Sequence, residues 1–146
     1  MRIRIHGFLI IFMCLIGLTA KQSTPDHELL VIVGAAGEDS YAEGFEEAAQ
    51  AWGEASKAAN ASITFIGREE DTASTDRERI HAWIQKLDTE TLAPAWIVYI
   101  GHGTYNRRDA YLNLTGPDLS AKDLARWLPS MDRTLIFVHG GSAASP

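Results

Sequence analysis

The stretch Trp96-Ile97-Val98-Tyr99-Ile100-Gly101-His102-Gly103-Thr104-Tyr105 decides how the rest of the chain is interpreted. Its first five residues are aromatic or β-branched and uncharged, and Pro94 and a glycine bound the run, which is typical of a fully buried strand. Ligands of open α/β sheets bind just outside the carboxyl ends of strands, so His102 stands where chemistry is expected. Its glycine neighbours would let a substrate approach the backbone and leave the Gly103 N–H free to donate. The alternative is a tight turn in which the histidine is only structural.

Three further apolar runs, at residues 29–33, 62–66 and 134–138, have the same strand character. Helical patterns separate them. The first helix is expected over about Glu38–Ala59, with an apolar stripe at Tyr41, Phe45, Ala48, Trp52, Ala55 and Ala59. Capping residues Thr75 and Ser120 begin two more helices, and residues 111–114 could form a short hairpin arm. This alternation predicts an α/β fold, a four-stranded and mainly parallel sheet with helices on both faces.

The first twenty residues differ in kind from the rest. Two arginines precede an apolar stretch from Phe8 to Leu18, and small residues ending at Ala20 come before polar sequence. This pattern is typical of a secretory signal peptide and predicts export to the periplasm or the medium. The alternative is an uncleaved membrane anchor at residues 8–20. Residues 21–28 are expected to be a linker, and residues 29–146 the folded domain.

Charge and cysteine content limit the possible partners and chemistry. Cleavage after Ala20 would remove two arginines and no acidic residue, so the 13 basic and 19 acidic residues of the chain would become 11 and 19, a net charge of −8. That balance argues against nucleic acid or an anionic membrane surface as a partner. The single cysteine, Cys14, lies inside the predicted signal peptide, so the mature chain would have no disulfide, thiolate metal site or cysteine nucleophile.

The order of these parts resembles the caspase and legumain superfamily of cysteine peptidases. Residues 97–103 resemble the strand and His-Gly pair that carries the catalytic histidine there, and residues 31–37 resemble the first strand and loop of the legumain branch. The resemblance covers about Leu29 to Ser145 and implies a caspase-haemoglobinase-like three-layer sandwich. Family members continue into further strands, whereas this chain stops eight residues beyond Val138, so a partial domain is expected.

The resemblance also implies roles for individual residues. His102 would be the general base and the Gly103 N–H one oxyanion donor, with the second donor on the nucleophile residue itself. The family has its cysteine after the fourth strand, where this chain has Gly140-Gly141-Ser142. Counting from Val138 places Gly141 at the nucleophile position, and one inserted residue places Ser142 there. Serine is the weaker nucleophile of the two at neutral pH.

Three interpretations of function follow. The first is an exported, catalytically degenerate peptidase-related domain whose partner is a peptide or protein. The second is an active serine-type hydrolase that uses Ser142 and His102. The third is an unrelated flavodoxin-like binding domain. No cofactor is expected and no metal site either, because His102 and His139 without a carboxylate or cysteine make a poor ligand set. The substrate-binding residues and the oligomeric state are not assigned.

Overall fold

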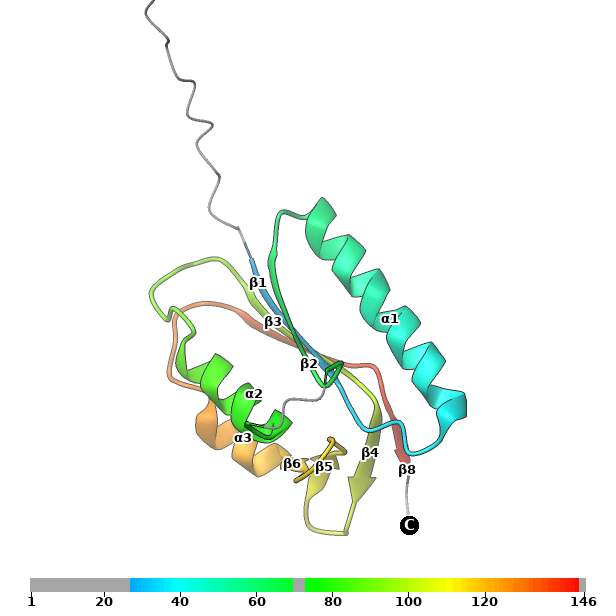
Figure 1. Cartoon of the computed structure of the whole chain (residues 1–146). Coiled ribbons are helices and arrows are strands. Elements are labelled where there is room, and N and C mark those ends of the chain that lie inside the picture. Colours follow the sequence, from blue (N-terminus) through cyan, green and yellow to red (C-terminus); the bar gives the residue numbers. More distant parts are fainter. Residues whose placement is uncertain (1–26, 70–72, 145–146) are drawn as a thin grey trace, which may run out of the picture.

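The computed structural model describes residues 27–69 and 73–144, and within them the chain forms an α/β domain (Figure 1). The main sheet has four parallel strands in the order β2-β1-β3-β7. These strands are β1 (Glu28–Val33), β2 (Ser62–Ile66), β3 (Ala95–Ile100) and β7 (Leu135–His139). The four apolar runs of the sequence are therefore neighbours in one parallel sheet, and the predicted α/β fold class is confirmed.

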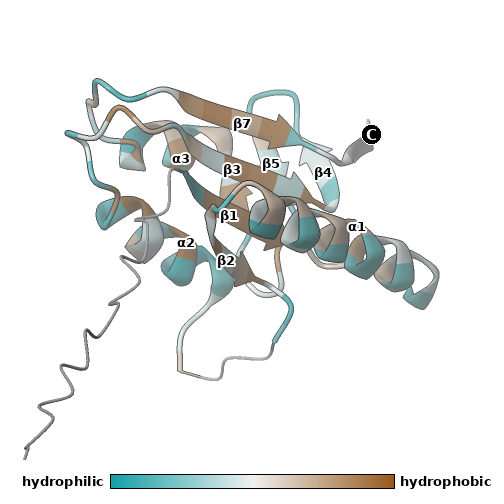
Figure 2. Ribbon diagram, turned by 90° about the horizontal axis from the view of Figure 1, so that it is seen from above, coloured by the Kyte–Doolittle hydropathy of each residue, from teal (hydrophilic) through white to brown (hydrophobic). Residues whose placement is uncertain are grey.

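Helices cover both faces of this sheet, as predicted. They are α1 (Asp39–Ala58), α2 (Asp76–Gln85) and α3 (Ala121–Trp127). α1 lies along one face, and α2 and α3 lie on the other (Figures 1 and 2). Because side chains alternate across a strand, β3 directs Val98 and Ile100 into the core under α1, and Ile97 and Tyr99 into the core under α2 and α3. Burial on both faces explains why the strands are continuously apolar (Figure 2).

The buried face of α1 differs in part from the predicted stripe. The residues that pack against the sheet are Phe45, Ala48, Ala49 and Trp52. Further along, Ala55 and Ala59 are exposed, and Ser56 is the buried position instead. The buried face runs from position 45 through 49 and 52 to 56, in steps of four, three and four residues, so the prediction for Ala55 and Ala59 was wrong.

The two predicted helix starts are confirmed. The Glu78 N–H donates to the Thr75 hydroxyl (3.3 Å), and the Thr75 N–H donates to the Glu78 carboxylate (2.8 Å), which completes a capping box for α2. At α3 the Asp123 N–H donates to the Ser120 hydroxyl (3.0 Å). Each cap supplies a partner to a backbone donor that the first helical turn leaves unpaired.

A second, smaller sheet extends the main one beyond the ends of β3 and β7. Its order is β6-β5-β4-β8, with β4 antiparallel to β5 and parallel to β8. Its strands are β4 (His102–Tyr105), β5 (Ala110–Leu112), β6 (Leu119–Ser120) and β8 (Ser142–Ala144). The sequence predicted only a hairpin arm at residues 111–114, and the observed arm is residues 110–112. His102 begins an extended strand, so the tight-turn alternative was wrong.

The predicted signal peptide, or anchor, at residues 1–20 lies outside the described residues. Of the predicted linker at residues 21–28, residues 21–26 also lie outside the described residues, and Glu28 belongs to β1. Within the described part of the chain, no helix combines the length and apolar character that crossing a bilayer requires.

Candidate functional site

The rim of the sheet where β3 and β7 end brings the two predicted site segments together. β3 continues through Gly101 into β4, and β7 continues through residues 140–141 into β8. β4 and β8 pair in parallel, and His102 and Ser142 are direct partners in that register. Paired positions on neighbouring strands lie about 5 Å apart. His102 and Ser142, which are 40 positions apart in sequence, are therefore adjacent at one edge of the sheet.

The backbone of His102 is held by a buried phenol that the sequence did not identify. The Tyr99 hydroxyl lies 2.5 Å from the His102 carbonyl oxygen and 3.0 Å from that of Asn113, so its one proton is shared between two acceptors. The Tyr99 side chain is fully buried, and this burial raises the pKa of its hydroxyl well above the ordinary value. Tyr99 therefore stays protonated and acts as a donor.

Two glycines make room for this phenol. A Cβ on Gly101 would lie 2.5 Å from the Tyr99 hydroxyl and 3.1 Å from the Cα of Gly34, and a Cβ on Gly34 would meet the same hydroxyl. The Gly34 N–H donates to the Ile100 carbonyl (2.8 Å), which joins the end of β1 to the end of β3. Gly101, one of the two glycines that the sequence associated with substrate approach, is thus packed against groups of the fold itself.

The imidazole of His102 lies against α1. Its ring centroid is 4.6 Å from that of Tyr41, with the planes at 87°, and 5.3 Å from that of Phe45, at 60°. Tyr41 and Phe45 are one turn apart on the helix and stack on each other at 6.3 Å. Edge-to-face contacts of this kind favour one ring orientation over others. The first two turns of α1 therefore confine the imidazole to the α1 side of the sheet.

Gly103 is not available as the predicted oxyanion donor. The Asn113 N–H donates to the His102 carbonyl (3.0 Å), so the polar backbone groups of His102 face β5. Successive residues of a strand direct their N–H and C=O groups to opposite sides, so those of Gly103 face β8. The expectation that its N–H is free was wrong, because β4 is paired along both edges.

Gly141 is likewise engaged within the fold. Its N–H donates to Nδ1 of His139 (3.3 Å), and a Cβ on this residue would collide with the Gly101 carbonyl. A side chain could not be accommodated at position 141 without moving the strand junction. Of the two positions considered for the nucleophile, Ser142 is the one in register with His102.

The two rim histidines lie on opposite faces of the sheet. His139 pairs in register with Tyr99, and their rings lie 5.5 Å apart on the α2–α3 side, whereas His102 contacts α1. The sheet separates the two imidazoles, so they cannot share a metal ion. Among the described residues, no three histidine, cysteine or acidic side chains cluster in a way that would hold a metal.

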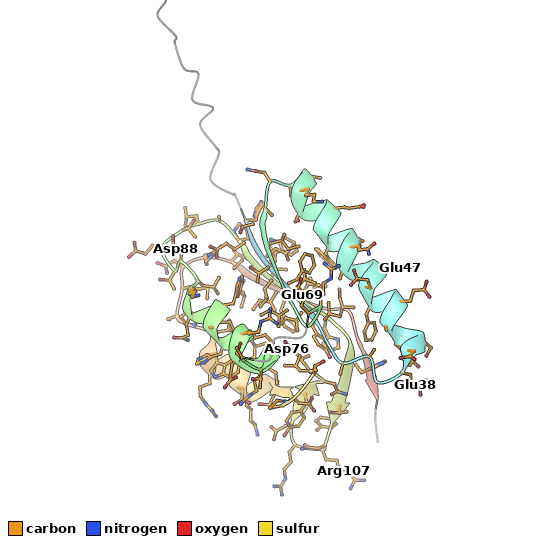
Figure 3. The ribbon with its side chains drawn as sticks, in the orientation of Figure 1. Glu38, Glu47, Glu69, Asp76, Asp88 and Arg107 are labelled. Carbon is orange, nitrogen blue, oxygen red and sulfur yellow. The ribbon has the colours of Figure 1, made fainter. Side chains whose placement is uncertain are left out.

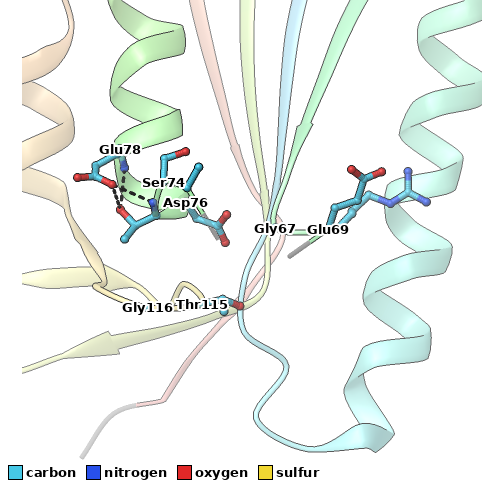
Figure 4. Close-up of a pocket in the computed structure, with 10 residues that line it drawn as sticks. Gly67, Glu69, Ser74, Asp76, Glu78, Thr115 and Gly116 are labelled. Atoms are coloured by element: carbon cyan, nitrogen blue, oxygen red, sulfur yellow. Dashed lines mark hydrogen bonds between the residues drawn. The ribbon is translucent and has the colours of Figure 1, made fainter. Parts of the chain in front are cut away.

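A cavity of about 480 Å³ lies away from this rim, between the end of β2 and the start of α2 (Figure 4). Two of its charged residues pair with side chains that do not line it. Arg68 pairs with Glu46 and stacks over the ring of Phe65 at 4.7 Å. Asp76 forms an ion pair with Arg79 at 3.3 Å. Arg68 and Asp76 are therefore committed to contacts within the fold rather than to a ligand.

Comparison with known proteins adds no relative to this description: no protein-family model matches the chain, and no curated protein does either.

Proposed function

We propose that this chain is a peptidase-related domain of the caspase and legumain type that no longer hydrolyses peptide bonds. One observation carries the proposal: a His-Gly pair at the end of β3 and a Gly-Gly-Ser segment at the end of β7 lie in register on neighbouring strands. Two parallel strands that deliver a base and a nucleophile to the same rim are what the resemblance requires. Export and a peptide or protein partner belong to the same proposal.

Loss of activity is supported by the state of the backbone donors. A tetrahedral intermediate needs two or more donors aimed at the developing oxyanion, and removing one costs about 10²–10³ in rate. Here the Gly103 N–H faces β8 and the Gly141 N–H is bonded to His139. In addition, the chain has no cysteine after residue 14, so a thiolate cannot act at this rim.

The proposal is tested by exposing the full chain to a biotinylated fluorophosphonate and, separately, to a library of peptide substrates. We expect neither covalent labelling nor cleavage, while a serine hydrolase of known reactivity labels under the same conditions. Labelling that mass spectrometry locates on Ser142 would contradict the loss of activity.

The peptidase kinship itself is tested by a thiol placed opposite the histidine. In Ser142→Cys, a neighbouring imidazole should accept the thiol proton and speed alkylation by iodoacetamide about tenfold over the Ser142→Cys/His102→Ala variant. Ser130→Cys, at an exposed and remote position, is the matched control and should not respond to His102→Ala. Equal alkylation rates with and without His102 would contradict the proposal that a base and a nucleophile meet at this rim.

A second candidate is the serine-type hydrolase, favoured by the same register of His102 with Ser142. It predicts fluorophosphonate labelling that Ser142→Ala abolishes and His102→Ala slows by several orders of magnitude. Labelling that survives Ser142→Ala would exclude this candidate.

A further inference from the structure

The edge formed by β7 is unpaired in the described structure. β7 ends the strand order of the main sheet, and β8 ends that of the second sheet on the same side. The Gly140 N–H donates to the Tyr99 carbonyl (2.8 Å), and the Thr134 carbonyl accepts from Ala95 (3.0 Å), so even-numbered positions face β3. The N–H and C=O groups of Leu135, Phe137 and His139 therefore face outward.

Residues 135–138 of this edge lack the residue types that usually prevent strand addition. Residues 135–138 are Leu-Ile-Phe-Val, with no lysine, proline or glycine among them. The side chain of Phe137 is 41% exposed, although it is among the larger apolar groups of the domain. A strand placed beside β7 would form a regular ladder and cover this ring.

An apolar cavity of about 370 Å³ opens beside the same edge. Phe137 and His139 line it from β7, Tyr105 and Tyr111 line it from the β4–β5 hairpin, and Leu124 and Leu128 line it from α3. It lies on the α2–α3 side of the sheet, whereas the imidazole of His102 lies on the α1 side. Side chains from a strand added to β7 would alternate between solvent and this cavity.

Positive charge lies at the hairpin end of the cavity, although the chain as a whole has a net charge of −6. Arg107 and Arg108 form the tip of the hairpin whose last pair lines it, and Arg107 extends away from the body of the protein (Figure 3). Neither guanidinium forms an ion pair within residues 27–69 and 73–144. Lys122 and Arg126 flank the α3 residues that line the cavity, but they are already paired with Asp109 (2.5 Å) and Asp123 (3.4 Å), so the charge open to a ligand is that of Arg107 and Arg108.

From this combination we infer that the β7 edge binds an extended polypeptide segment in which acidic and apolar side chains alternate. The backbone of the segment would pair with Leu135, Phe137 and His139, which is strand addition to a sheet edge. Its apolar side chains would enter the cavity, and its acidic ones would face Arg107 and Arg108 at the hairpin tip.

The test uses the full chain and a fluorescent capped octapeptide in which leucine and valine alternate with aspartate and glutamate. We expect saturable binding by fluorescence anisotropy that weakens as salt is added. A peptide with lysine at each acidic position should bind at least about tenfold more weakly, because its charges would be repelled by the arginines of the hairpin tip. A tenfold change in Kd corresponds to 1.4 kcal/mol. Methylating alternate backbone nitrogens should weaken binding similarly, because it removes the donors of the ladder.

Two variants locate the site on the protein. Phe137→Lys should weaken binding at least about tenfold, while Leu92→Lys, at an apolar position 82% exposed, should not. Arg107→Gln/Arg108→Gln removes two positive charges from the hairpin tip alone and should weaken binding severalfold, with Lys57→Glu on α1, which also changes the net charge by −2, as the charge-matched control.

Absence of binding, or equal affinity for the lysine peptide, would overturn the inference. So would a Phe137→Lys variant that is folded by circular dichroism and binds as wild type does. Concentration-dependent dimers in sedimentation that exclude the peptide would assign the edge to a second copy instead. None of these outcomes depends on the chemistry of His102 and Ser142, so the inference and the proposed function can fail separately.

Discussion

At the scale of single residues, the candidate site depends on how two rings are held. The phenol of Tyr99 ties the backbone of His102 and Asn113 together beneath the rim. The rings of Tyr41 and Phe45 confine the His102 imidazole above it. One contact acts on the main chain and the other on the side chain, so they can be removed independently.

Removing the hydroxyl in Tyr99→Phe should destabilise the protein by about 1 kcal/mol. The loss is modest because each acceptor keeps another donor: the Asn113 N–H bonds the His102 carbonyl (3.0 Å), and the Ala35 N–H bonds the Asn113 carbonyl (3.0 Å). Urea denaturation measures the difference.

Gly101→Ala should destabilise the protein more than Tyr99→Phe does, by about 1–3 kcal/mol, because its Cβ would lie 2.7 Å from the Tyr99 ring. A Gly101→Ala variant as stable as wild type would contradict the tight packing described here.

Replacing Tyr41 by leucine should change the environment of the His102 imidazole without unfolding the domain. Tyr41 is 47% exposed, so little core packing is lost, but the ring that meets the imidazole at 87° disappears. We expect a shift of the His102 ring-proton resonances and faster modification of His102 by diethyl pyrocarbonate. Tyr105→Leu is the matched control, since Tyr105 is 48% exposed and lies at the other end of β4. If both variants leave the resonances unchanged, Tyr41 does not orient His102.

At the scale of elements, α2 and α3 are joined through one carboxylate. Asp123 accepts from the Ser120 hydroxyl (2.8 Å), which precedes its own helix, and from Arg77 of α2 (2.8 Å). These hydrogen bonds lower the pKa of Asp123, that from Ser120 having the larger effect. The same side chain thus helps to start α3 and holds α3 against α2.

This carboxylate should make stability depend on pH in a defined direction. An acid with a lowered pKa in the folded state adds stability above its unfolded pKa, about 3.9 for aspartate, and that contribution is lost as the pH falls through the lowered value. Asp123→Asn should therefore be less stable than wild type at neutral pH, and the gap should close in strong acid. Urea titrations across this range measure the gap. Asp132→Asn, at an exposed position, is the control. A gap that is constant with pH would show that the Asp123 charge is not responsible.

At the scale of the whole molecule, one buried cation joins the ends of the sheet that lie opposite the candidate site. The Arg133 side chain is fully buried and donates to Glu28 at the start of β1 (2.9 Å), to the Asp88 carbonyl (2.9 Å) and to the Ala93 carbonyl (2.8 Å). Arg133 itself lies just before β7. It therefore links β1, the connection from α2 to β3, and the edge strand.

Arg133→Met should destabilise the domain by about 3–5 kcal/mol, because methionine fills part of the space but leaves these acceptors without their donor. Arg133→Lys should recover only part of the loss, since an ammonium group cannot reach all of the acceptors in the geometry of a planar guanidinium. The free energy of unfolding in urea measures both. A loss below about 1 kcal/mol for Arg133→Met would mean that the burial of this charge costs as much as its bonds contribute.

Much of the fold was predictable because its signals are local. The apolar runs at residues 29–33, 62–66 and 96–100 are strands within one residue of the predicted bounds, and the caps at Thr75 and Ser120 begin helices as predicted. Caps and buried strands depend on a few neighbouring residues, so their patterns are readable one segment at a time. The α1 stripe failed at Ala55 because alternating steps of three and four residues can be placed on a helix in more than one way, and the sheet beneath α1 determines which placement is buried.

By itself, the sequence determined the strands, the helices, the α/β class and the candidacy of His102, since burial periodicity and capping are properties of short segments. Only the tertiary structure decided that His102 and Ser142 are paired, that the Gly103 N–H faces β8, that Tyr99 holds the rim and that Arg133 is buried. The physical reason is that each of these facts depends on which strands become neighbours. The packing of the whole sheet determines which strands are neighbours, and the residues of a single strand do not reveal it.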